Sequence, residues 1–324
     1  MKILITGGTG FIGSHVVEHF LGRKDAEIFA LVRDVQNLKW LKGLDIVPLA
    51  GDIMNIPVLP VDIDYVFHIA GSTKALKAAD YYTVNRQGTA SLFHSLASQK
   101  ITPKRIVCLS SLAASGPSNR EQPVRESDKP CPVSLYGKSK LEGEREALKF
   151  KDRHSIAILR VGVVYGPRDR AFLPYFNLIK KGILASVGTR QNTVSYVYVK
   201  DLVNAIATCI HKNIDSGEVV HIANPEPCPF EDFGLAAAKV MHVKLRRIKL
   251  PLPLAYMATI ASDVAGKISG KPTVFSRQKY AELKQDAWVA DTAKARKLLS
   301  FHPEYTLNQG MNETIGWYLE QGWL

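Results

Sequence analysis

The sequence contains few cysteines and no grouping of residues that could bind a metal. Among 324 residues there are four cysteines, none in a CxxC pair or clustered with histidine. Neither a disulfide framework nor a zinc site is therefore expected, and a reducing compartment, the cytoplasm, is predicted. Since no His, Cys, Asp and Glu residues show the spacing of metal ligands, we predict no metal. The cysteines are Cys108, Cys131, Cys209 and Cys228.

The sequence also lacks an apolar run long enough to cross a membrane. The N-terminal run stops at Thr6 after three apolar residues, which is too short for the hydrophobic core of a signal peptide. The longest apolar stretch, 250–261, contains two prolines. It falls short of the roughly 20 apolar residues that a spanning helix needs, so we predict no stable membrane insertion. Two interpretations of 250–261 stay open: a core helix of a smaller lobe, which we favour, and an apolar lid over a substrate pocket.

Basic residues outnumber acidic ones, and the formal net charge at pH 7 is +12. Such a surface suits a polyanion, or a cofactor that carries phosphate. No basic run is interleaved with aromatic residues, and no recognised nucleic-acid-binding module is present. We therefore predict a small-molecule substrate and no nucleic-acid partner.

Short apolar runs alternate with longer amphipathic segments through the first two-thirds of the chain. Strands that are apolar almost throughout, separated by helices, are typical of a parallel sheet covered on both faces. We predict an α/β fold: a Rossmann-type doubly wound parallel sheet with a smaller, mostly helical C-terminal substrate lobe. The predicted strands are 2–6, 27–32, 45–52, 64–71, 105–111 and 155–162, and the predicted helices are 14–24, 83–99 and 136–150.

The pattern loosens after residue 169 and ends in an irregular, helical tail with several prolines. There, helices are predicted at 172–182 and 201–212 and strands at 193–201 and 218–225. We predict a dinucleotide-binding domain over 1–166, to which 193–223 returns, and a smaller lobe made of 167–192 and 224–324.

The first predicted strand runs directly into the glycine-rich segment TGGTGFIG, which opens a helix. Gly7 or Gly8 allows a tight turn, Gly10 lets a pyrophosphate approach the backbone, and Gly13 lets helix and strand pack closely. The helix N-terminus adds free N–H groups and a partial positive charge. The segment therefore predicts a dinucleotide site. The residues assigned to it here are Gly7, Thr9, Gly10, Phe11, Ile12 and Gly13.

The end of the second predicted strand bears on the choice of cofactor. In this fold an acidic residue there binds the ribose hydroxyls of NAD, whereas an arginine accommodates the extra phosphate of NADP. The strand ends in Arg33-Asp34, and Arg33 comes first. We therefore predict NADP, with NAD as the alternative. Asp52, at the next strand end, could accept a hydrogen bond from the adenine amino group.

A serine, a tyrosine and a lysine suggest proton transfer. The fifth predicted strand ends in serines, at the sheet edge where open α/β folds bind ligands. About 25 residues later, Tyr136 and Lys140 lie one helical turn apart. A carbonyl that is reduced by hydride needs a proton donor. A lysine ammonium beside the tyrosine would lower the phenol pKa from about 10, and a serine hydroxyl would hold the substrate oxygen.

These segments together resemble the extended short-chain dehydrogenase/reductase family over nearly the whole chain. The matching segments are TGGTGFIG, GDI, HIAG, VNRQGT, LSSLAASG, YGKSK, LRVGVVYGPRD and VYVKDLVNAI. The resemblance implies a nicotinamide cofactor and a catalytic serine, tyrosine and lysine, which fall on Ser111, Tyr136 and Lys140. Tyr136 and Lys140 are also assigned to the cofactor site. The other cofactor-site residues that it implies are Ile53, Ala70, Gly71, Asn85, Ser110, Val161 and Val163.

The branch of the family is less sharply indicated. Sugar-nucleotide epimerases and dehydratases of this family usually carry an asparagine where this chain has Val163. Val163 and Arg33 make the chain more similar to the dihydroflavonol reductase and hydroxysteroid dehydrogenase branch. We therefore predict an NAD(P)-dependent oxidoreductase, with a nucleotide-sugar epimerase or dehydratase that holds NAD tightly as the alternative. A non-enzymatic binding protein ranks last because the Tyr-Lys pair is kept. The resemblance also implies a homodimer.

Overall fold

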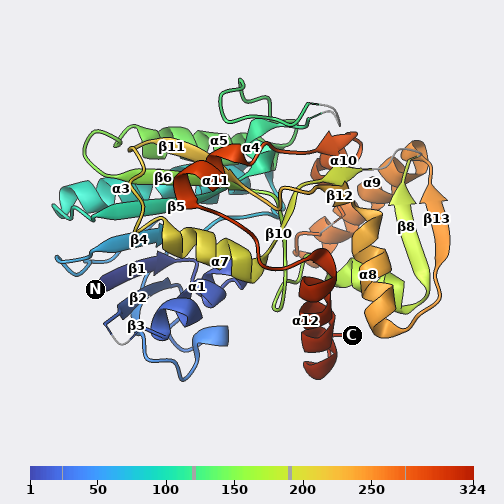
Figure 1. Ribbon diagram of the computed structural model, residues 1–324, viewed down its shortest axis with the longest axis horizontal. Coiled ribbons are helices and arrows are strands. Elements are labelled where there is room, and N and C mark those ends of the chain that lie inside the picture. The colour runs from blue at the N-terminus through green and yellow to red at the C-terminus, as the bar shows by residue number, and fades with distance from the viewer. Residues whose placement is uncertain (24, 119–121, 189–191, 274) are drawn as a thin grey trace.

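A seven-stranded parallel sheet forms the centre of the computed structural model, which describes residues 1–23, 25–118, 122–188, 192–273 and 275–324 (Figure 1). The strand order is β11-β6-β5-β4-β1-β2-β3, and all neighbours are parallel. The predicted α/β fold and doubly wound sheet are therefore confirmed. The strands are β1 (Lys2–Thr6), β2 (Glu27–Val32), β3 (Val47–Ala50), β4 (Tyr65–His68), β5 (Arg105–Ser111), β6 (Ile156–Val161) and β11 (Glu218–Ile222).

Helices cover both faces of this sheet because its strands are apolar on both sides. Successive side chains of a strand point to opposite faces. Ile3 and Ile5 of β1 belong to the core shared with α1 and α7, whereas Leu4 belongs to the core shared with α3 and α5. The helices around the sheet are α1 (Phe11–Leu21), α2 (Ala78–Tyr82), the π-helical turn η2 (Thr83–Gln87), α3 (Gly88–Ser98), α4 (Leu112–Ser115), α5 (Leu135–Leu148) and α7 (Val199–Thr208), and the short 3-10 turn η1 (Lys39–Leu41) precedes β3.

The strand order places the ligand crevice. β1 lies between β2 and β4, so the chain builds the sheet outward from β1, first in one direction and then in the other. In open α/β sheets the crevice at this switch point, beyond the carboxyl ends of the strands, binds the ligand. The glycine turn after β1 and the segment after β4 both lie there.

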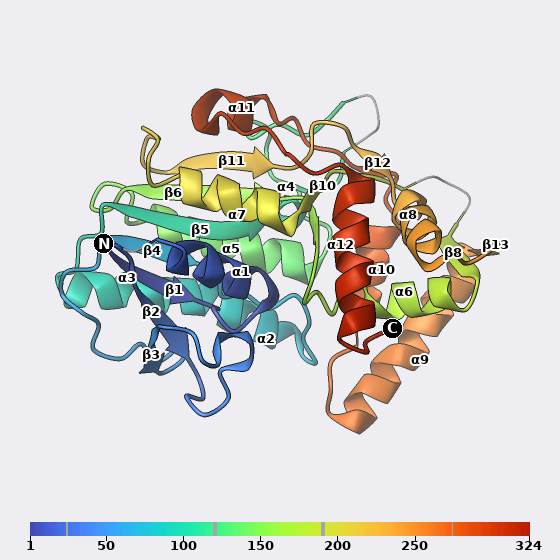
Figure 2. The same ribbon diagram turned by 60° about the horizontal axis from the view of Figure 1, so that its bottom comes forward.

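Most of the remaining elements gather at the end of the molecule toward which the sheet strands point, whereas α11 (Ala293–Leu299) lies beside β11 (Figure 2). Three small sheets pair β10 with β7, β9 with β12 and β14, and β13 with β8. The strands are β7 (Val163–Tyr165), β8 (Ile183–Val187), β9 (Thr193–Val194), β10 (Tyr196–Tyr198), β12 (Cys228–Pro229), β13 (Arg246–Leu250) and β14 (Ala287–Trp288). The helices are α6 (Leu173–Lys180), α8 (Glu231–Met241), α9 (Leu252–Ser269), α10 (Arg277–Leu283), α11 (Ala293–Leu299) and α12 (Leu307–Glu320).

The strand predicted at 193–201 is instead two short strands and the start of a helix. Ser195 separates β9 from β10: its amide donates to the carbonyl of Trp288 (2.8 Å), and its carbonyl accepts from the amide of Val163 (2.9 Å). The chain therefore passes from one small sheet to another at this residue, and α7 begins at Val199. The division at residues 166 and 224 stays a prediction; α11, from the tail, packs beside β11 of the main sheet.

Candidate active site

The glycine turn links β1 to α1 with no room for a side chain at Gly7 or Gly13. Gly7 has φ +77°, a left-handed conformation that favours glycine. A Cβ on Gly13 would lie 2.1 Å from the carbonyl oxygen of Gly7, so only glycine allows this approach of helix to strand. Gly10 stands at the N-cap of α1, where it has no side chain to accept from the first helical amides. The turn therefore presents backbone N–H groups to the crevice, as anion binding requires.

The carboxyl end of β2 presents basic groups to the same crevice. Arg33 and Lys39 both line the cavity there, together with the ring of Trp40. Asp34 is engaged locally, because its carboxylate accepts a hydrogen bond from the amide of Gln36 (2.9 Å). Of the two adjacent residues that favour different cofactors, Arg33 therefore lines the cavity, whereas Asp34 is hydrogen-bonded within its own turn.

Asp52 follows β3 and also lines the cavity. One of its carboxylate oxygens accepts hydrogen bonds from the amides of Met54 (2.7 Å) and Asn55 (3.0 Å). These two bonds hold the carboxylate at the turn, with Ile53 in the cavity wall beside it.

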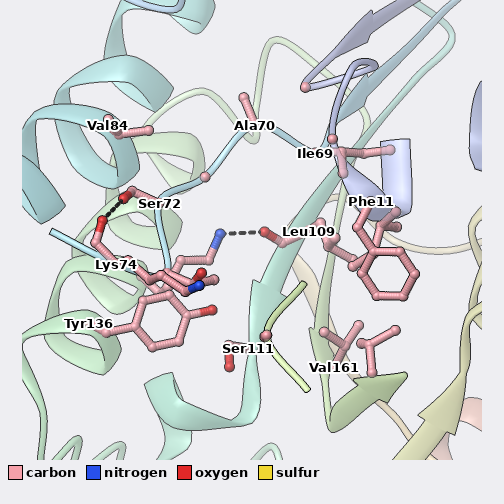
Figure 3. A pocket seen from close by; sticks show the side chains of 18 of the residues that line it. Phe11, Ile69, Ala70, Ser72, Lys74, Val84, Leu109, Ser111, Tyr136 and Val161 are labelled. Carbon is pink, nitrogen blue, oxygen red and sulfur yellow. Dashed lines mark hydrogen bonds between the residues drawn. The ribbon is translucent and has the colours of Figure 1, made fainter. Parts of the chain in front are cut away.

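Ser111, Tyr136 and Lys140 all line this cavity, and Figure 3 shows Ser111 and Tyr136 in its wall. Ser111 ends β5 and caps α4, where its hydroxyl accepts from the amide of Ala113 (3.2 Å). Tyr136 lies in the first turn of α5, and its phenol lies beside Ser111 (Figure 3). The Lys140 ammonium donates to the carbonyl of Leu109 (2.6 Å). The structure thus brings the three predicted catalytic side chains to one place.

The pKa values at this site differ from the sequence expectation. Burial raises the pKa of Tyr136, Ser111 opposes this rise and Glu282 adds to it. The resulting pKa is about 12. Burial also lowers the pKa of Lys140 to about 8, against the opposing effect of Glu144. The sequence predicts a lowered phenol pKa, whereas burial raises it in the folded chain, where the Lys140 ammonium donates to the Leu109 carbonyl.

Asn85 supports the site from behind the cavity wall. Every predicted site residue other than Asn85 lines one and the same cavity, which has a volume of about 1260 Å³. Asn85 is buried in η2, where its amide oxygen accepts from the amide of Ser72 (2.8 Å) and its amide nitrogen donates to the Ser72 carbonyl (3.0 Å) and to the Ser139 hydroxyl (2.8 Å). It therefore ties the segment after β4 to α5 at Ser139, the residue directly before Lys140.

His68 fixes the end of β4 in the same region. Its two ring nitrogens lie 2.8 Å from the Thr6 hydroxyl and 2.9 Å from the Thr89 hydroxyl. Burial lowers the pKa of His68 to about 3, so the ring is neutral at physiological pH. Since the Thr89 hydroxyl donates to the Asn85 carbonyl (2.8 Å), β1, β4 and η2 share one hydrogen-bond network.

A buried ion pair underlies the serines of β5. The Arg160 guanidinium donates to both carboxylate oxygens of Glu144, with a shortest separation of 2.7 Å, and both side chains are 4% exposed. Ser110 donates to the same carboxylate, and Arg160 also donates to the Ser115 hydroxyl (3.1 Å). The pair joins α5 to β6 and contacts Ser110, the residue directly before Ser111. The sequence analysis did not single out either charged residue.

The tail contributes residues to the cavity that the sequence analysis missed. Gln278 and Glu282 of α10 line the cavity and accept hydrogen bonds at the N-terminus of α5, from the Leu135 amide (2.9 Å) and the Ser134 hydroxyl (2.7 Å). Roughly 145 residues separate the partners along the chain, which no local pattern can encode. Helix α10 therefore closes the cavity beside Tyr136.

Two kinds of feature are absent from the described ranges. None of the helices there is long and apolar enough to cross a membrane. No group of three or more His, Cys, Asp or Glu residues lies together as metal ligands would in the part of the chain that the structure describes.

Comparisons of the sequence and of the structure with known proteins agree with one another. The model of the NAD dependent epimerase/dehydratase family matches residues 3–223. The chain is 26% identical to a ceramide reductase of Caulobacter vibrioides, over 99% of this chain and 96% of the relative. It is also 26% identical to a UDP-glucose 4-epimerase of Vibrio cholerae, over 98% and 96%. Among solved structures, UDP-glucuronic acid 4-epimerase from Bacillus cereus in complex with NAD superposes with a TM-score of 0.79 at 24% identity, and each chain is covered completely.

Proposed function

We propose that this chain, which belongs to the NAD-dependent epimerase/dehydratase family and is an enzyme, is an NADP-dependent oxidoreductase that interconverts a carbonyl and an alcohol. The observation that carries the proposal is the continuity of the cavity. One cavity runs from the glycine turn, past Arg33, to Ser111, Tyr136 and Lys140, and on to α10. A dinucleotide and a substrate can therefore share it.

The described residues fit such a cofactor. The close approach of Gly13 to Gly7 leaves the helix N-terminus open to phosphate oxygens, and Arg33 and Lys39 supply cations at the end of β2. Gly71, between the glycine turn and Lys140, has backbone so near the ammonium that a Cβ there would lie 3.4 Å from it. When bound, the cofactor supplies or accepts the hydride.

Three side chains of this protein, Ser111, Tyr136 and Lys140, carry out the proton transfer. In the reducing direction the Ser111 hydroxyl orients the substrate oxygen, and Tyr136, protonated because its pKa is about 12, donates its proton to that oxygen. The Lys140 ammonium offsets the negative charge that then develops on the phenol. Tyr136 regains a proton before the next cycle, and in the oxidising direction each transfer is reversed.

Arg33→Ala is expected to weaken NADPH binding by about 10- to 100-fold, which corresponds to a charge-assisted hydrogen bond of about 1.5–3 kcal/mol. NADH binding should change little, since the added phosphate is the group that Arg33 would meet. Fluorescence titration with each cofactor measures both affinities. Asp34→Asn is the matched control, because it removes a neighbouring charge and can keep the turn to the Gln36 amide. Equal NADPH affinity in Arg33→Ala and the unaltered protein would contradict the preference for NADP.

The rate of carbonyl reduction is expected to fall as pH rises through about 8. Lys140 is charged below its pKa of about 8 and neutral above it, whereas Tyr136 keeps its proton throughout this range. Loss of the ammonium removes the charge that stabilises the developing phenolate, so kcat/KM should decline on the alkaline side. A pH profile of kcat/KM measures this. Lys140→Met should lower the rate at every pH and abolish the decline, and an unaltered protein with a flat profile to pH 10 would contradict the assignment.

A second candidate is a nucleotide-sugar epimerase that keeps NAD bound and regenerates it in each cycle. The match to a UDP-glucose 4-epimerase over almost the full length of both chains supports it. The net consumption of cofactor during turnover distinguishes the oxidoreductase from the epimerase. An oxidoreductase consumes one NADPH for each carbonyl reduced, whereas an epimerase turns over without net loss of cofactor and retains NAD through purification. Homodimer formation and a cytoplasmic location stay predictions.

A further inference from the structure

Helix α9 presents its large apolar side chains to solvent. Met257, Val264 and Ile268 are 64%, 51% and 83% exposed, and their spacing of seven and four residues places them on one side of the helix. The opposite side packs on the protein through small residues, Ala255, Thr259 and Gly266, which are buried. A surface helix of a globular protein normally shows the reverse arrangement. Figure 2 shows α9 at the lower edge of the molecule, away from the main sheet.

The segment that contains α9 carries much of the positive charge of the chain. Residues 233–281 contain nine Lys and Arg residues and a single acidic residue, Asp263, so they account for +8 of the formal net charge of +12. Asp263 is already paired with Arg277 (2.8 Å). The exposed basic residues of this segment include four before α9, one in its last turn and one after it: Lys244, Arg246, Arg247, Lys249, Lys267 and Lys271.

The helix also borders a cavity next to that of the active site. A second cavity of about 550 Å³ lies between α9, α10 and residues 75–81. Tyr81, Thr273, Ser276 and Gln278 line both this cavity and the larger one. An object that contacts the outer side of α9 would therefore lie near a cavity that shares part of its wall with the site that contains Tyr136.

We propose that α9 docks the protein on the surface of an anionic lipid bilayer. An exposed apolar helix face flanked by Lys and Arg is suited to lie in the plane of the bilayer interface, with its apolar side chains among the acyl chains and its cations at the phosphates. The charge favours this surface over a second copy of the chain, because two such segments would repel each other. Docking adds a location to the proposed function: the second cavity then opens beside the bilayer, from which an apolar alcohol or ketone can enter.

Vesicle flotation tests the docking surface directly. The full-length protein should float with vesicles of phosphatidylcholine that contain about 30% phosphatidylserine, and less with phosphatidylcholine alone or at high salt. Met257→Gln/Ile268→Gln should weaken binding to the anionic vesicles by at least about tenfold. Val58→Gln/Val61→Gln is the matched control: it alters two valines that are 87% and 82% exposed elsewhere on the surface, and it should bind as the unaltered protein does.

Two results would overturn the proposal. One is an unaltered protein that fails to bind anionic vesicles. The other is a dimer, detected by light scattering, that Met257→Gln/Ile268→Gln converts to monomer, since the apolar face would then be covered by a second copy. Melting curves of both variants establish that they are folded. Cofactor titration is run in parallel without vesicles, so a failure of the proposed function is seen separately from a failure of docking.

Discussion

Tyr136→Phe is expected to lower kcat/KM for carbonyl reduction by about 10²- to 10⁴-fold, the usual contribution of a positioned general acid. The substitution removes only the phenol oxygen, which lies beside Ser111 in the cavity wall. Cofactor affinity should stay within about threefold, because the lost group acts in the transition state and not in ground-state binding. Steady-state kinetics and cofactor titration of the same preparation measure the two effects.

Tyr65→Phe is the matched control for this substitution. Tyr65 stands at the amino end of β4, the opposite end of the strand from the cavity, so kcat/KM should be unchanged. A Tyr136→Phe variant that reduced substrate at close to the normal rate would remove Tyr136 from the mechanism. If both activity and cofactor affinity collapsed, the residue would be structural instead.

Arg160→Met is expected to destabilise the fold by about 3–5 kcal/mol, the usual effect of leaving one partner of a buried ion pair alone. Glu144 would lose a guanidinium that contacts both of its oxygens, at a position that is 4% exposed. Because Ser110 donates to the same carboxylate, the end of β5 should also be displaced, and activity should fall in the remaining folded protein. Denaturant unfolding followed by circular dichroism measures the free energy.

Arg145→Met provides the comparison on the same helix. Arg145 pairs with Glu142 at 2.6 Å, but the two side chains are 61% and 30% exposed, so its loss should cost at most about 1 kcal/mol. The double variant Arg160→Met/Glu144→Leu should recover much of the stability, since no unpaired charge then stays buried. Equal losses in Arg160→Met and Arg145→Met would show that burial does not distinguish the two pairs.

The family and the fold could be predicted from the sequence because their signals are local. The alternation of apolar runs with amphipathic segments predicts the parallel sheet, and TGGTGFIG directly after β1 predicts the turn at its end. The four-residue step from Tyr136 to Lys140 lies within one helix, where spacing alone determines that both side chains share a face. The family match over residues 3–223 confirms the resemblance that these segments suggest.

Other features of the site depend on how distant elements pack. The sequence places Lys140 beside Tyr136, but the carbonyl of Leu109, on β5, determines where the ammonium points. Glu282 acts on the phenol from α10, and Arg160 meets Glu144 only because β6 lies under α5. Each of these contacts joins two elements, and neither element's own periodicity specifies which neighbour it will meet.

The stretch 250–261 also combines a feature that the local sequence determines with one that depends on tertiary packing. Its composition by itself indicates an apolar helix that is too short to cross a membrane, and this much the chain determines locally. Whether such a helix lies in a core or on a surface depends on which side packs against its neighbours. In the folded chain the small residues Ala255 and Thr259 face inward and Met257 faces outward. Hydrophobicity determines that these side chains avoid water, but only tertiary packing decides how many of them the protein itself can cover.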